Sequence, residues 1–212
     1  SWNGTSWTEV ADLNQGRATG AGAGVSNTSA LSYAGFKDPP GSPVSETESW
    51  NGSSWTELND MNTGRYGAGR GVGTATSALA VGGNSGPPGN ILQAKAESWN
   101  GSTWTEVNDL NTTRQQGASA GDSNTLAGVG HFSSTAVLGV GGKNASNNNI
   151  ANNEEWNGAS FVELADLSNA TKKSVGVGTT SSALNISGAY PGSTVYTGVE
   201  EWNGNTRSTK TI

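Results

Sequence analysis

The side chains that could do chemistry in this chain recur at regular intervals. Three sets of carboxylates repeat along it: Glu9, Glu57, Glu106 and Glu163; Asp12, Asp60, Asp109 and Asp166; and Glu48, Glu97, Glu154 and Glu200. A glycosidase needs two carboxylates in unequal environments, one of them with a raised pKa. Because each carboxylate is copied from repeat to repeat, we predict that these groups accept hydrogen bonds from turns and caps. A hydrolase is kept as the less favoured alternative.

Histidine and cysteine chemistry is nearly missing from the sequence. His131 is the only histidine, and there is no cysteine. We interpret His131 as a loop or packing residue, against the alternatives of a catalytic base or a metal ligand. The sequence therefore predicts no catalytic residue, no metal site and no cofactor, and we expect a protein that is not an enzyme.

Arginines begin one strand of each repeat. They are Arg17, Arg65 and Arg114, with Lys172 or Lys173 near the fourth position. The favoured interpretation is a structural ion pair between each arginine and the aspartate five residues before it, Asp12, Asp60 or Asp109. The alternative is a ring of cations around one mouth of a central axis, which could hold an acidic ligand.

The elements that must position these groups are defined by an internal repeat. Trp-Asn-Gly occurs five times, beginning at Trp2, Trp50, Trp99, Trp156 and Trp202, at intervals of 48, 49, 57 and 46 residues. A period near 50 residues is typical of propeller blades. Asn-Gly is a strong hairpin signal, because both residues accept a positive φ. If the loop holds two or four residues, Trp50 and Trp55 lie on one face and pack between blades.

Each repeat supplies four short strands. They are a glycine-rich strand, a strand ending in a glycine pair such as residues 76–83, a strand ending at Trp-Asn-Gly, and a strand such as residues 54–62. Small residues are expected on the innermost strand, near a narrow axis. With 32 glycines and eight tryptophans in 212 residues, we predict one all-β propeller domain, 1–212, of four blades with four antiparallel strands each. The blade repeats run approximately over 15–62, 63–111, 112–168, and 169–206 plus 1–14.

The two ends of the chain look complementary. Residues 6–13 match the outer strand of a repeat, so we predict that they pair with residues 197–202 and close a monomeric ring. The alternatives are a piece of a longer propeller, or several copies completing a larger ring. In either case residues 207–212 could form their own outer strand.

The order of Arg65, a strand ending at Gly82 and Gly83, and then Trp99 and Trp104 resembles the kelch repeat. The phrase W-N-G-x-x-W-T-E-V-x-D-L-N is also similar to repeats in structural and tail-associated proteins of tailed, especially marine, bacteriophages. The resemblance implies a kelch-like propeller in an extracellular or virion location. Departures from the kelch pattern are Ala34 and Ser187 in place of a first glycine, and Phe161 in place of the second tryptophan.

Charge and composition exclude some classes of binding partner. The net charge is −6 with no stripe of Lys and Arg, so we expect no nucleic-acid partner. No stretch approaches the roughly 20 apolar residues of a membrane span, so we expect no membrane insertion. We predict a non-catalytic interaction or structural module of a virion surface or tail fibre that recognises a host-surface glycan or a protein receptor.

The alternative function is a lectin with one weak glycan site per blade. An exposed indole beside an asparagine can hold a sugar ring, although the favoured role of the repeat tryptophans is the core between blades. The candidate ligand residues are Trp50, Asn51, Trp99, Asn100, Trp156 and Asn157 at the corners, and Arg17, Arg65 and Arg114 at the axis. A protein-binding module would instead use the non-repeated segments 121–134 and 143–153.

Overall fold

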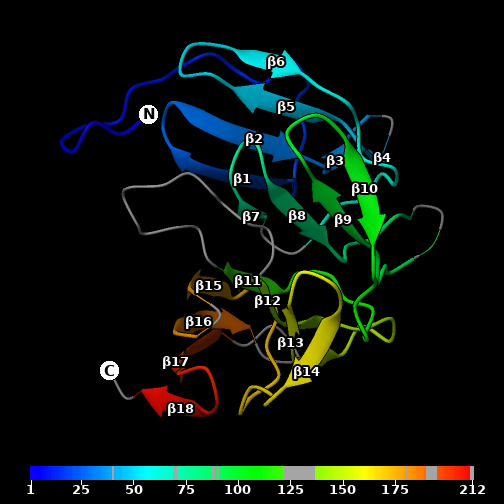
Figure 1. The fold of residues 1–212 in the computed structure, drawn as a ribbon, viewed down its shortest axis with the longest axis vertical. Coiled ribbons are helices and arrows are strands. Elements are labelled where there is room, and N and C mark those ends of the chain that lie inside the picture. The colour runs from blue at the N-terminus through cyan, green and yellow to red at the C-terminus, as the bar shows by residue number, and fades with distance from the viewer. Residues whose placement is uncertain are drawn as a thin grey trace.

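The protein folds into four antiparallel sheets of four strands each, as a computed structural model shows (Figure 1). The structure describes residues 1–39, 41–68, 71–86, 89, 91–121, 137–179, 181–189 and 195–210. All of its regular elements are strands, so the predicted all-β, four-bladed propeller is confirmed.

Blade 1 contains β1 (Ala21–Ser26), β2 (Ser29–Tyr33), β5 (Thr47–Trp50) and β6 (Trp55–Glu57), and carries the small ribbon of β3 (Phe36–Lys37) and β4 (Ser42–Pro43). Blade 2 contains β7 (Val72–Gly73), β8 (Ala78–Val81), β9 (Ala96–Trp99) and β10 (Trp104–Val107). Blade 3 contains β11 (Ala118–Gly121), β12 (Val137–Lys143), β13 (Asn149–Trp156) and β14 (Phe161–Leu164), and blade 4 contains β15 (Val175–Gly178), β16 (Ala183–Ala189), β17 (Val195–Trp202) and β18 (Arg207–Lys210).

The strand order within every blade follows the chain outward from the axis. In Figure 1 the inner strands β1, β7, β11 and β15 follow one another near the middle of the molecule, and β6, β10, β14 and β18 lie at its periphery. Small residues on the inner strand allow close backbone contact. A Cβ added to Gly22 would lie 3.1 Å from the carbonyl oxygen of Leu31 on the neighbouring strand, which is the crowding that the glycine-rich pattern predicts.

Two left-handed backbone positions recur in each blade, one at the end of the second strand and one just before the first strand. The first set is Ala34, Gly82, Gly141 and Ser187, with φ of 59°, 62°, 59° and 60°; the second is Thr19, Gly67, Gln116 and Lys173, with φ of 53°, 58°, 57° and 58°. Ala34 and Ser187 therefore keep the conformation that glycine adopts elsewhere. Their departure from the glycine pair changes the side chain and leaves the backbone path intact.

Main-chain hydrogen bonds join neighbouring blades at these positions. Each of three junctions carries two bonds of 2.8 to 3.1 Å. Between blades 1 and 2, Gly35 N–H donates to Arg65 O and Gly67 N–H to Thr19 O. Between blades 2 and 3 the bonds are Gly83 N–H to Arg114 O and Gln116 N–H to Gly67 O, and between blades 3 and 4 they are Gly142 N–H to Thr171 O and Lys173 N–H to Gln116 O. Equivalent bonds between blades 4 and 1 would join Gly188 to Arg17 and Thr19 to Lys173, and neither forms within the described ranges. The junction between blades 4 and 1 thus lacks the main-chain bonds of the other three.

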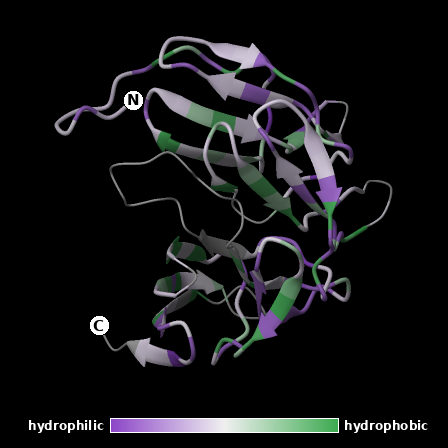
Figure 2. Cartoon of the chain, viewed as in Figure 1, coloured by the Kyte–Doolittle hydropathy of each residue, from purple (hydrophilic) through white to green (hydrophobic). Residues whose placement is uncertain are grey.

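Aromatic side chains fill the spaces between blades, and hydrophobic residues gather along second strands such as β2 and β8 (Figure 2). Tyr33 of blade 1 packs against Trp99 and Trp104 of blade 2, and the Trp104 indole N–H donates to Thr47 Oγ1 at 2.9 Å. The next clusters contain Trp156 and Phe161, and then Trp202. The prediction that Trp50 and Trp55 share a face is confirmed, because they are directly opposite across a four-residue turn.

The predicted pairing of residues 6–13 with residues 197–202 is wrong. β18 occupies that place, with Trp202 opposite Arg207 and Glu200 opposite Thr209. A local turn explains the outcome: Asn203 Oδ1 accepts hydrogen bonds from the N–H groups of Asn205 and Thr206, and a short hairpin loop loses less chain entropy than a contact across the whole sequence. Among the described residues, the N-terminal Trp2 and Trp7 bridge each other, and both are exposed.

We predict that Trp104→Ala will lower the free energy of unfolding by about 3–5 kcal/mol, because it empties part of the core between blades 1 and 2 and removes the bond to Thr47. Trp7→Ala is the matched control: its side chain is 79% exposed, so its effect should stay within about 0.5 kcal/mol. Denaturant titration of both variants measures the difference, and equal losses would contradict an inter-blade role for Trp104.

Candidate functional site

The asparagines of the Trp-Asn-Gly corners are engaged in their own turns. The Oδ1 atoms of Asn51, Asn100 and Asn157 each accept hydrogen bonds from the N–H groups two and three residues ahead, at 2.8 to 3.0 Å. The Nδ2 groups of Asn51 and Asn100 donate to the hydroxyls of Ser54 and Thr103 at 3.3 Å. These amides stabilise an Asx turn, and the two hydrogen bonds to each Oδ1 occupy the acceptor that a sugar hydroxyl would need.

The tryptophans of the same corners are buried. Trp50, Trp99 and Trp156 are 6%, 1% and 4% exposed. The Trp50 indole N–H donates to the carbonyl of Asn27 at 2.8 Å, and that of Trp99 to the carbonyl of Ala75 at 3.1 Å. Inter-blade packing and turn formation account for the structure of these corners; their role as ligand residues stays a prediction.

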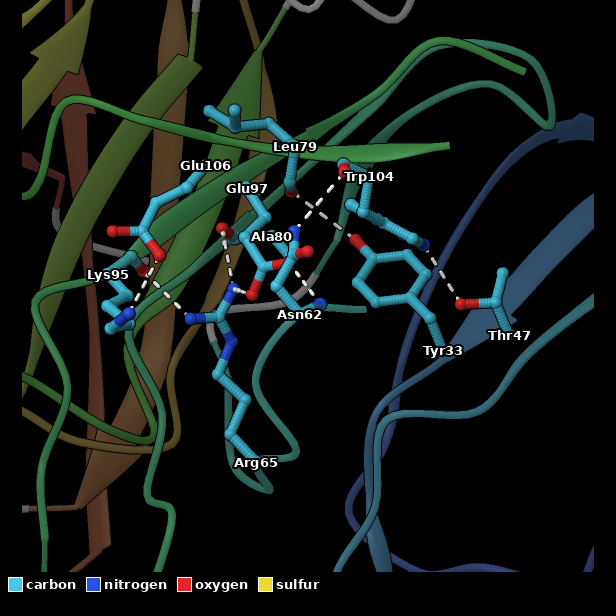
Figure 3. A network of polar contacts seen from close by, with 10 residues as sticks. All are labelled: Tyr33, Thr47, Asn62, Arg65, Leu79, Ala80, Lys95, Glu97, Trp104 and Glu106. Atoms are coloured by element: carbon cyan, nitrogen blue, oxygen red, sulfur yellow. Dashed lines mark hydrogen bonds and ion pairs between the residues drawn. The ribbon is translucent and has the colours of Figure 1, made fainter. Parts of the chain in front are cut away.

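The arginines form buried ion pairs with glutamates of the third strand. Arg17 pairs with Glu48, Arg65 with Glu97 and Arg114 with Glu154. In blade 2, shown in Figure 3, Arg65 Nη2 lies 3.0 Å from Glu97 Oε1, and Nη1 donates to the carbonyl of Lys95 at 3.2 Å. Burial lowers the pKa of Arg65, and the Glu97 carboxylate offsets part of that effect.

The predicted aspartate partners of these arginines are therefore wrong. Asp12, Asp60 and Asp109 are exposed on the connection that leaves the outer strand, whereas the glutamates lie inside the blade. Each glutamate also receives the backbone N–H of the asparagine in that connection: Asn14 to Glu48 and Asn62 to Glu97 at 2.7 Å, and Asn111 to Glu154 at 2.6 Å. The prediction that one set of carboxylates accepts hydrogen bonds from turns is confirmed.

The propeller topology places the repeated corners on the face opposite the connections between the second and third strands. Strands alternate in direction, so the turns after the first and third strands lie on one face, and the connections after the second and fourth strands lie on the other. The corners occupy the first face. The second face, here called the loop face, carries the unlike connections 34–46, 82–95 and 144–148. In the last of these, residues 145–148 are exposed. Residues 122–134 of the predicted 121–134 segment, His131 among them, lie outside the described residues.

Three lysines gather on the loop face. Lys143 ends β12, while Lys172 and Lys173 lie in the connection that enters blade 4, and Lys172 bridges Ala189. Burial lowers the pKa of Lys143, and the neighbouring charges of Lys172 and Lys173 lower it further. None of the three forms an ion pair with a described residue. The sequence placed Lys172 or Lys173 near the fourth arginine position, but it gave no signal that Lys143, some thirty residues earlier, lies beside them.

Comparisons with known proteins add no identity. No protein-family model matches the chain, and no curated protein matches it significantly in sequence. The described part of the chain has no helix that could span a membrane. Within the same residues, no three His, Cys, Asp or Glu side chains are grouped so that they could hold a metal ion.

We predict that Arg65→Met will cost about 3–5 kcal/mol of stability, because it leaves Glu97 buried without its cation. Lys95→Met is the control: its ion pair with Glu106 is 2.7 Å long but largely exposed, and its loss should cost no more than about 1 kcal/mol. Thermal and denaturant unfolding measure both. A second change, Glu97→Gln on top of Arg65→Met, should recover part of the loss. If Arg65→Met lost no more stability than Lys95→Met, the buried ion pair would not be needed for the fold.

Proposed function

We propose that this protein is a non-catalytic interaction module that binds a surface ligand through the loop face. The observation that carries the proposal is the division between the two faces. Repeated, internally bonded corners lie on one face, and the unlike connections 34–46, 82–95 and 144–148 lie on the other. A rigid scaffold that presents dissimilar loops is a common arrangement for recognition, because the loops vary while the blades hold them in place.

The ligand that this face suits best carries negative charge. Lys143, Lys172 and Lys173 concentrate positive charge on one part of a protein whose net charge is −6. The neighbouring turn, residues 144–148, is rich in asparagine and offers both donors and acceptors to hydroxyl groups. An acidic glycan of a host surface combines both properties, and a protein receptor with an acidic patch is the other ligand to test.

The module would act on a virion surface or tail fibre, outside the cell. This location is supported by the resemblance of its kelch-like Trp-Asn-Gly repeats to those of tailed bacteriophage proteins. One glycan site per blade at the corners has less support, because the corner indoles are buried and the corner amides are bonded within their turns. A single site on the loop face follows better from the asymmetry of the loops.

We predict that the protein will bind immobilised acidic glycans or intact host cells, and that Lys143→Ser with Lys173→Ser will weaken binding at least tenfold by removing two charges. Binding should also fall with ionic strength, since the lysines are near the surface. Replacing residues 144–148 by Asn-Gly should weaken binding too while keeping the β12–β13 hairpin, because Lys143 and Asn149 pair directly. Biolayer interferometry on glycan-coated sensors measures these affinities.

The matched control changes the corners. Asn51→Ser, Asn100→Ser and Asn157→Ser together retain a side-chain oxygen for each turn but remove the amides. This triple variant should bind as the parent does. Loss of binding in the triple variant, with full binding in both loop-face variants, would contradict the proposal and favour one site per blade.

A further inference from the structure

Blade 4 breaks the pattern of buried ion pairs. Glu200 of β17 has the place of Glu48, Glu97 and Glu154: it has no exposed surface, and its Oε2 accepts the backbone N–H of Ser168 at 2.9 Å. The residue in the arginine position, however, is Thr171. No guanidinium of blade 4 therefore reaches this glutamate from the connection.

The backbone shows that Thr171 truly stands in the arginine position. Gly142 N–H donates to the carbonyl of Thr171 at 2.8 Å, just as Gly83 N–H donates to the carbonyl of Arg114. The chain path is the same, and only the side chain differs. Because a threonine side chain reaches only to Oγ1 and Cγ2, it does not extend into the region that holds a guanidinium in the other blades.

Several buried polar atoms of this part of blade 4 have no hydrogen bond. Glu200 Oε1 and Thr171 Oγ1 have no hydrogen bond, and neither does the side-chain amide of Asn185; all three residues are at least 98% buried. Asn185 of β16 lies directly opposite Glu200 of β17, so their side chains are adjacent on one face of the sheet. Burying unpaired polar groups, one of them a carboxyl group, is costly. Three such groups in one place indicate a bound partner.

The chemistry of the site follows from the blade that is complete. In blade 2 the Arg65 guanidinium contacts Glu97 and the carbonyls of Lys95 and Ala80. Glu200, Gly198 and Asn185 have the equivalent positions in blade 4, from the pairing of β16 with β17. The set is one carboxylate with neutral oxygens, which suits a hard cation of single charge; calcium sites normally use more carboxylates.

We propose that Glu200, Asn185 and Thr171 form a buried binding site for a small monovalent cation, which does in blade 4 what an arginine does in the other blades. Arg207 of β18 interacts electrostatically with Glu200, and its Nη2 is buried without a hydrogen bond, but it does not take this place. Arg207 stacks over the ring of Trp202 at 5.3 Å, and its Nε donates to the carbonyl of Ala165 at 3.3 Å. Arg207 and Glu200 form no ion pair within the described residues.

The test measures thermal stability against the concentration of single cations at constant ionic strength, with tetramethylammonium chloride as the balancing salt because its cation is too bulky for the site. A ligand that binds only the folded state raises the midpoint as its concentration exceeds the dissociation constant. We expect potassium, sodium, ammonium or guanidinium chloride at millimolar concentration to raise the midpoint of the parent protein in a saturable way.

Two variants assign the effect to this site. Thr171→Arg supplies the missing guanidinium, so it should raise the midpoint in tetramethylammonium chloride and abolish the response to small cations. Glu200→Gln removes the charge and should abolish the response as well. Thr8→Arg is the matched control, since Thr8 is exposed and far along the chain; it adds the same charge and should leave the response unchanged.

Sodium NMR of the parent protein provides a measurement that needs no variant to fold. Sodium line broadening that potassium reverses supports the site. No saturable response to any of the four cations would overturn the proposal and show that Glu200 is compensated within the chain. A response of Thr171→Arg identical to that of the parent protein would also overturn the proposal. If calcium saturated the response at a lower concentration than every monovalent cation, the assignment of a singly charged ligand would be wrong.

Discussion

A glutamate buried in the third strand of every blade is the constraint on which the rest of the structure depends. An ionised carboxylate without contact to water must be paired and hydrogen-bonded, or it destabilises the fold. In blades 1 to 3 this requirement fixes the connection from the preceding repeat, whose asparagine N–H and arginine both reach Glu48, Glu97 or Glu154. The same connection then delivers the left-handed residues that bond one blade to the next.

The fold could be predicted because its signals are periodic and local. The Trp-Asn-Gly period gave the blade, and the parity of a four-residue turn placed Trp50 beside Trp55. The partner of each arginine could not be predicted, because an aspartate and a glutamate recur at fixed distances from it and only the folded path decides between them. The predicted closure was wrong for a related reason. Residues 6–13 match the repeat better than residues 207–210 do, but a local hairpin forms more easily than a contact between chain ends.

Repetition and departure from repetition carry different information in this molecule. Side chains copied in all blades, such as the corner asparagines, hydrogen-bond within the scaffold. The chemistry left over belongs to residues that break the pattern, namely Lys143 on the loop face and Thr171 inside blade 4. From the sequence, the copied residues were the candidate ligands, and the replacement of an arginine by Thr171 was not predicted, although Thr171 has the arginine position in the fourth repeat. The sequence could not show that Glu200 is buried, and this burial is the reason why the missing arginine matters.

The bonds between blades have a further consequence for how such a protein changes size. Each of the three bonded junctions joins two unlike halves, a glycine N–H on one blade and the arginine or threonine carbonyl of the next. Contacts of this head-to-tail kind involve nearest neighbours only, as in other repeat arrays, and nothing within a single blade encodes how many blades there are. Duplication or loss of one repeat by unequal recombination would therefore preserve every remaining junction. Copy number can drift in such a lineage without any change to the interface that each new unit must satisfy.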